Sequence, residues 1–123
     1  MQNTRVDLHK RLYDYALAIV RFVEKLPKDS VSQTLGRQLL RSGTSVSANI
    51  VEAGSASSKK DYINFFTHAL KSANESKFWI SLLKDSGKCS SESAETILKE
   101  TAELANILGA SVKTMKANLK NKT

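Results

Sequence analysis

The 123-residue sequence has few of the residues that interrupt helices or cross-link a chain: one proline, five glycines and one cysteine. Proline fixes φ and lacks an amide hydrogen, so a chain whose only proline is Pro27 permits long helices almost everywhere. Cys89 has no partner for an intramolecular disulfide, and no second cysteine or histidine lies at zinc-ligand spacing. These shortages exclude a disulfide framework and a zinc module, and they are typical of a reducing compartment.

Long apolar runs are also missing. The longest purely apolar run, residues 16–20, is far shorter than the roughly 20 residues that cross a bilayer. The first residues lack the charged-then-apolar pattern of a signal peptide. We therefore expect a soluble, cytoplasmic protein without membrane contact, and the length fits a single domain over residues 1–123.

Four segments carry apolar residues at the alternating spacings of three and four that form one face of a helix. In the first segment, Leu12, Tyr15 and Ile19 follow this rule. The pattern predicts helices over about residues 4–26, 30–53, 58–86 and 91–120. Because all three connections are short, we expect an all-α fold, an antiparallel up-down-up-down four-helix bundle.

The second and third predicted helices each have an unusual side. On the second, Gly36, Gly43 and Ser47 form a stripe of small residues, which predicts either close approach of another helix or a local irregularity. On the third, a second apolar row widens the arc beyond what one pair of neighbouring helices needs; its members are Phe65, Phe78, Trp79 and Leu82. That row is either additional core or a subunit interface.

Polar residues interrupt the apolar pattern of the same two helices. We interpret Asn49, Glu52 and Glu75 chiefly as a structural polar network that sets helix register, with a recognition surface as the alternative. If the two helices pair antiparallel around a hinge at Gly54, Arg41 is the best-placed partner for Glu75.

No catalytic constellation is present. By the same hinge arithmetic, Glu52 and Glu75 lie too far apart to share a cleft as a hydrolytic pair. Neither histidine follows glutamate at the Glu-x-x-His spacing of a di-iron bundle, and Cys89 has no base nearby in sequence. We expect no enzyme, no metal and no cofactor.

Positive charge is what the sequence has in excess: 19 Lys and Arg against 12 Asp and Glu, a formal charge of +7. Such a chain attracts RNA or DNA by releasing counterions, and without a base-reading motif the contacts would be to the backbone. The candidate nucleic-acid-binding residues are Arg37, Arg41, Lys59, Lys60 and Arg11. Lys59 and Lys60 open a predicted helix, where amide groups also favour phosphate. The alternative is a protein-interaction scaffold whose charge mainly provides solubility.

Several sequence blocks resemble one family. They are Arg-Leu-Tyr at 11–13, Leu-Pro at 26–27, Gln-Leu-Leu-Arg-Ser at 38–42, Ser-Val-Ser-Ala-Asn-Ile-Val-Glu-Ala at 45–53 and Asp-Tyr-Ile-Asn-Phe-Phe at 61–66. In this order they are similar to the bacterial four-helix-bundle proteins encoded in intervening sequences of 23S rRNA genes. The resemblance covers nearly the whole chain, although Ala56 stands where the family usually has arginine.

The resemblance implies a closed homo-oligomer, a pentameric ring of bundles, without catalytic activity. The family is similar to the accessory protein of diversity-generating retroelements, which binds nucleic acid and a reverse transcriptase through a basic surface. The expected partners are therefore other copies of the chain, RNA or DNA, and a protein that the sequence does not identify.

Overall fold

The computed structural model describes residues 4–121, with side chains from Asp7 onward, and this part of the chain contains four helices and no strand. The helices are α1 (Thr4–Glu24), α2 (Ser30–Ala53), α3 (Lys59–Asp85) and α4 (Ser91–Asn121). α1 ends two residues before the expected position 26, because a residue that precedes proline is disfavoured in the helical region. None of the four helices is long and apolar enough to cross a membrane.

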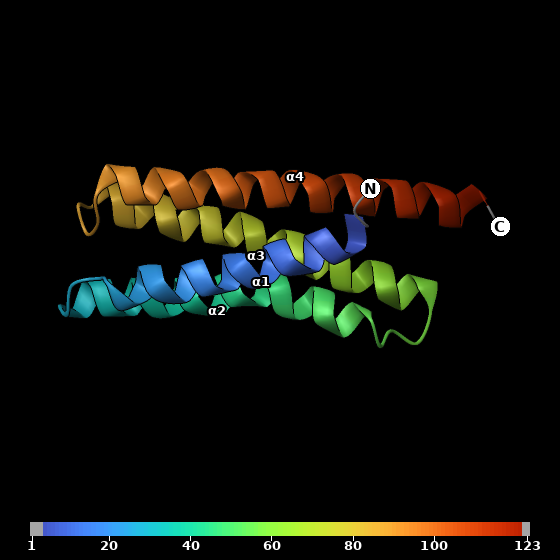
Figure 1. Ribbon diagram of the computed structural model, residues 1–123, viewed down its shortest axis with the longest axis horizontal. Helices are drawn as coiled ribbons and strands as arrows, with labels where there is room; N and C mark the ends of the chain where they lie inside the picture. The colour runs from blue at the N-terminus through green and yellow to red at the C-terminus, as the bar shows by residue number, and fades with distance from the viewer. Residues whose placement is uncertain (1–3, 122–123) are drawn as a thin grey trace.

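The helices run antiparallel in an up-down-up-down order (Figure 1). The α1–α2 loop (residues 25–29) and the α3–α4 loop (residues 86–90) lie together at what we call the two-loop end. The α2–α3 loop (residues 54–58) and the last turns of α4 lie at the opposite end, the hinge end. α2 packs extensively on α3 and α3 on α4, whereas the contact between α1 and α4 is the least extensive of the four neighbouring pairs. The predicted four-helix bundle is confirmed.

The core consists of the apolar faces that the sequence spacing predicts. Its fully buried large side chains come from all four helices: Tyr15, Ile19, Leu39, Val46, Ile80, Leu83, Leu104 and Leu108. Burying one such side chain stabilises a fold by about 1.5–3 kcal/mol, so this continuous seam is the main source of stability.

α1 and α2 approach each other closely at the stripe of small residues. Gly43 is buried, and a Cβ added to it would lie 2.8 Å from both Cγ1 and Cγ2 of Ile19. One turn further on, the Ser47 hydroxyl donates a hydrogen bond of 2.6 Å to the carbonyl oxygen of Leu12. α2 continues without a break through this region, so the stripe marks helix contact and not a local irregularity.

Two polar contacts in the core have defined donors. The Thr101 hydroxyl donates to the Ile97 carbonyl oxygen at 2.7 Å, so at the 2.7 Å contact with Tyr15 the phenol must be the donor. Tyr15 is almost completely buried, and this burial raises the pKa of Tyr15 to about 12. In the same way Ser76 donates to the Ser72 carbonyl oxygen, which makes Ser42 the donor in the 2.8 Å Ser42–Ser76 contact.

The loops are held by caps. Asp29 is the N-cap of α2 and accepts hydrogen bonds of 2.9 Å from both the amide and the hydroxyl of Ser32. These bonds lower the pKa of Asp29, and Lys88 of the neighbouring loop lies 3.5 Å away. Ser58 caps α3 by accepting from the Asp61 amide at 3.0 Å. Gly87, with φ of 74°, takes the left-handed conformation that favours glycine and ends α3.

Candidate nucleic-acid interface

The five predicted cationic residues do not form one patch. Arg37 and Arg41 lie in the middle of α2, whereas Lys59 and Lys60 begin α3 at the hinge end. At a rise of 1.5 Å per residue, Arg41 is about 18 Å from the last residue of α2. Arg11 contacts α4, on the other side of the bundle from the α2–α3 contact. Any polyanion that touches all five must therefore wrap around the molecule.

Arg11 is held by two carboxylates of α4. Its Nε lies 2.8 Å from Glu100 Oε2, and its Nη2 lies 2.6 Å from Glu100 Oε1 and 2.7 Å from Glu103 Oε2. The hydrogen bonds to Glu100, opposed by partial burial, raise the pKa of Arg11 further above its usual value. This guanidinium joins α1 to α4, and two carboxylates already neutralise its positive charge.

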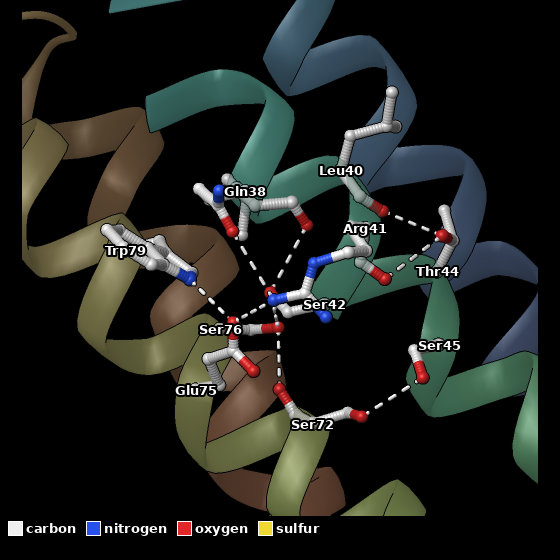
Figure 2. A network of polar contacts seen from close by, with 11 residues as sticks. Gln38, Leu40, Arg41, Ser42, Thr44, Ser45, Ser72, Glu75, Ser76 and Trp79 are labelled. Atoms are coloured by element: carbon white, nitrogen blue, oxygen red, sulfur yellow. Dashed lines mark hydrogen bonds and ion pairs between the residues drawn. The ribbon is translucent and has the colours of Figure 1, made fainter. Parts of the chain in front are cut away.

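Arg41 forms the ion pair expected from the sequence, which is confirmed. Its Nη2 lies 2.5 Å from Glu75 Oε2, and the indole nitrogen of Trp79 donates to the same oxygen at 3.0 Å (Figure 2). The pair is largely exposed, so we attribute no more than about 1 kcal/mol of stability to it. Arg37 is exposed, and its Nη2 donates to the Thr34 hydroxyl at 3.5 Å.

Four serines carry much of the polar contact between α2 and α3, a role that the sequence analysis did not assign to them. Ser42 bonds Ser76 and, one turn further on, Ser72 donates to Ser45 at 3.1 Å (Figure 2). Asn49 joins this line by donating to the Ser45 carbonyl and hydroxyl oxygens at 2.8 and 3.0 Å. The signal was available in the sequence: Ser42 falls on the apolar seam of α2, and Ser72 and Ser76 stand one turn apart on α3.

Glu52 is not part of this network. It is exposed at the end of α2, eleven residues beyond Arg41, which pairs with Glu75. That separation is about 16 Å along the helix, so the structure does not bring Glu52 and Glu75 together. Across residues 4–121, no three His, Cys, Asp or Glu side chains lie close enough to hold a metal ion. Burial raises the pKa of the Cys89 thiol, the opposite of what activates a nucleophile.

A lysine cluster does form at the hinge end. Lys59 and Lys60 are exposed in the first turn of α3, and Lys59 lines a hollow of about 220 Å³ with Met115, Asn118 and Leu119 of α4. The start of α3 and the end of α4 therefore lie side by side. α4 contributes Lys113, Lys116 and Lys120, all exposed, and no acidic residue follows Glu103 in the sequence.

The α4 lysines lie on the side of the helix that faces α3. A Cβ on Gly109 would lie 3.9 Å from both Cδ atoms of Leu70 in α3. Lys113, Lys116 and Lys120 follow Gly109 by four, seven and eleven residues, the spacing of one helical stripe. We define the hinge-end lysine cluster as Lys59, Lys60, Lys113, Lys116 and Lys120. The first two are among the five residues predicted from the sequence as the binding site, whereas the three on α4 belong to the wider set of basic residues on which the nucleic-acid prediction rests.

The fold and its charge define a class: a basic antiparallel four-helix bundle with a lysine cluster at one end. Residues 4–110 match the family described as 23S rRNA-intervening sequence protein, and the chain belongs to this family. The chain is also similar to a crystal structure of a protein with unknown function from the S23 ribosomal protein family of Bacteroides thetaiotaomicron VPI-5482. That similarity is 34% identity with a TM-score of 0.80, over 85% of this chain and 97% of the other. None of the curated proteins compared with the chain matches it.

Proposed function

We propose that the protein is a non-enzymatic nucleic-acid-binding protein that holds the phosphate backbone of RNA with the hinge-end lysine cluster. The observation that carries this proposal is that five exposed lysines lie on the start of α3 and the last turns of α4, two segments that line one hollow together. The family description names 23S rRNA, so a structured RNA is the first ligand to test.

The cluster suits a phosphate backbone better than base edges. Lysine presents a compact charge on a flexible stem, and the exposed side chains carry no planar group that would read a base. Each lysine that neutralises a phosphate adds about 0.7–0.9 to the slope of log affinity against log salt. Five contacts predict a slope of roughly 3.5–4.5, so affinity should fall about 100- to 500-fold between 50 and 200 mM salt.

The working form of the protein is, in this proposal, a homo-oligomer. Two large apolar side chains one turn apart on α3 are exposed near the two-loop end, Phe78 at 59% and Leu82 at 38%. Phe78 packs edge-on against the half-buried Trp79, with ring centroids 5.0 Å apart, so the patch extends over two aromatic rings. An exposed apolar patch of this kind supports a subunit interface, and a ring would multiply several weak lysine clusters by avidity. The pentameric ring implied by the family resemblance stays a prediction.

The test is a titration of fluorescein-labelled 23S rRNA hairpins, followed by fluorescence anisotropy at 50 and 200 mM KCl. The triple variant K113Q/K116Q/K120Q should bind at least tenfold more weakly at 50 mM and lower the salt slope by about 2–3. The matched control K28Q/K71Q/K99Q removes the same charge from exposed positions outside the cluster, and it should keep the wild-type slope.

Two results would count against the proposal. If the wild-type protein does not bind at 50 mM salt, the RNA-binding function is wrong, and the apolar patch then favours the alternative function, a protein-interaction scaffold without a nucleic-acid ligand. If both triple variants lose the same affinity, net charge and not the hinge-end lysine cluster causes the binding.

A further inference from the structure

A groove opens between α1 and α4 near the two-loop end, far from the hinge-end lysine cluster. Its volume is about 660 Å³, within the range of small-molecule sites. In the middle of the bundle, Arg11 and Tyr15 tie α1 to α4 through Glu100 and Thr101. Beyond these ties the last turns of α1 lie apart from the first turns of α4 (Figure 1). The groove lies beyond the end of the contact between α1 and α4, which is the least extensive helix contact of the bundle.

The wall of the groove is apolar. Leu17, Phe22 and Leu26 of α1 and its loop face Ile97 of α4 across it. Leu26 and Ile97 are buried at 4% and 6% exposure, whereas Leu17 and Phe22 are half-buried. These residues leave apolar surface beside a space that a flat or extended hydrocarbon group can fill.

The rim of the groove is positively charged. Arg21 and Lys25 line it, are exposed, and form no ion pair with any residue that the structure describes. Lys88 lines it from the opposite loop, 3.5 Å from Asp29. The one acidic residue of the lining, Asp14, already pairs with Lys10 at 3.0 Å. A ligand in this groove therefore meets two unmatched cations and no unmatched carboxylate.

The first turn of α4 adds to the same preference. Ser90 and Ser93 line the groove, and the Ser90 hydroxyl accepts from the Ser93 amide at 3.1 Å, which places the N-terminus of a 31-residue helix at its edge. The positive end of a helix dipole favours anions nearby.

We propose that this groove binds a small organic anion with an apolar body, its acid group at Arg21 and Lys25 and its body against Leu17, Phe22 and Ile97. Because of the apolar wall, the groove should prefer this ligand class to inorganic phosphate and to a nucleic-acid backbone. Because Arg21 and Lys25 at the rim are not paired with a carboxylate, the groove should also prefer an organic anion to a neutral hydrocarbon. The site does not depend on the RNA-binding function, because it shares no residue with the hinge-end lysine cluster.

Cys89 provides a reporter inside the groove. It is the only cysteine of the chain, lines the groove and is half-buried. A bound ligand covers the thiol, so occupancy should slow its alkylation by iodoacetamide at least about fivefold. Mass spectrometry of the intact protein measures this rate at one position without an added label.

The experiment titrates the full-length protein with 8-anilinonaphthalene-1-sulfonate, an aromatic anion that fluoresces in apolar surroundings. We expect R21Q/K25Q to raise the Kd about five- to tenfold, since each of two exposed charge contacts contributes about a two- to threefold change in affinity. The control R37Q/K71Q removes equal charge elsewhere on the surface and should bind as the wild type does. N-phenyl-1-naphthylamine, which lacks the sulfonate, should bind wild type and R21Q/K25Q equally.

A second variant tests the place of binding. Ala18 is exposed on the groove lining, so A18W fills the space without entering the core and should abolish both the fluorescence and the protection of Cys89. Decanoate should displace the dye and inorganic phosphate should not. The proposal is overturned if the dye does not bind, if R21Q/K25Q and A18W bind it like the wild type, or if the bound dye leaves the Cys89 rate unchanged.

Discussion

Replacing Gly43 with alanine tests how closely α1 and α2 approach. The new Cβ would lie 2.8 Å from Cγ1 and Cγ2 of Ile19 and 2.9 Å from its Cδ1. Carbon atoms in ordinary contact are roughly 3.5–4.0 Å apart. Ile19 is fully buried and branched at Cβ, so it has few alternative rotamers. Relief must come from a shift of α1 away from α2, which also stretches the hydrogen bond from Ser47 to Leu12.

The expected cost is the balance of opposing effects. Alanine favours the helix over glycine by about 1 kcal/mol, whereas overpacking a core costs about 1–3 kcal/mol. A weakened Ser47 hydrogen bond costs up to about 1 kcal/mol more. We therefore expect G43A to lower the free energy of unfolding by about 1–2 kcal/mol. G109A is the matched control, because its Cβ meets Leu70 at an ordinary 3.9 Å and should stabilise by about 0.5–1 kcal/mol.

The assay is urea unfolding followed by far-ultraviolet circular dichroism, at one protein concentration so that assembly does not alter the comparison. I19A completes a double-mutant cycle. Alone it should cost about 2–5 kcal/mol, and with G43A it should cost about 1–2 kcal/mol less, because the new methyl group occupies space that the shorter side chain leaves. If G43A is as stable as G109A, or if the two substitutions add independently, the close approach is wrong.

Two further predictions concern pH and assembly. Tyr15 has a pKa of about 12 in the folded protein against about 10 in the unfolded protein. The stability that this difference provides is therefore complete below pH 10 and is lost as the pH rises toward 12. Between pH 8 and 11 the free energy of unfolding, measured in urea, should fall by about 1.4 kcal/mol more for the wild type than for Y15F. A difference in stability between the two proteins that does not change with pH would contradict this. F78S/L82S should convert an oligomer into folded monomers in analytical ultracentrifugation, whereas V51S, also at an exposed apolar position, should not. A monomeric wild type would refute the interface.

Helix positions and inner faces were predictable because they depend on short-range rules. Spacings of three and four put Leu12, Tyr15 and Ile19 on one face whatever α1 packs against, and Pro27 stops the helix by local sterics. The Arg41–Glu75 pair was predictable for a related reason: a short loop at Gly54 leaves little freedom in the antiparallel register. Phe78 and Leu82 were open to two interpretations, and only their exposure in the folded structure removes them from the core.

The amino-acid sequence by itself determined four helices, their apolar faces, the excess of positive charge and the family. Where the charges lie relative to one another was decided only by tertiary structure, because it depends on how each helix is rotated and which neighbour it meets. The rotation of α1 and α4 places Arg11 against Glu100 and Glu103, which are 89 and 92 residues away in the sequence. These carboxylates neutralise its charge. The same packing places the start of α3, with Lys59 and Lys60, beside the end of α4 and so adds three basic residues of α4 to the two that were predicted as binding residues. Attraction to polyanions follows from composition, whereas the place of binding follows from packing between distant segments.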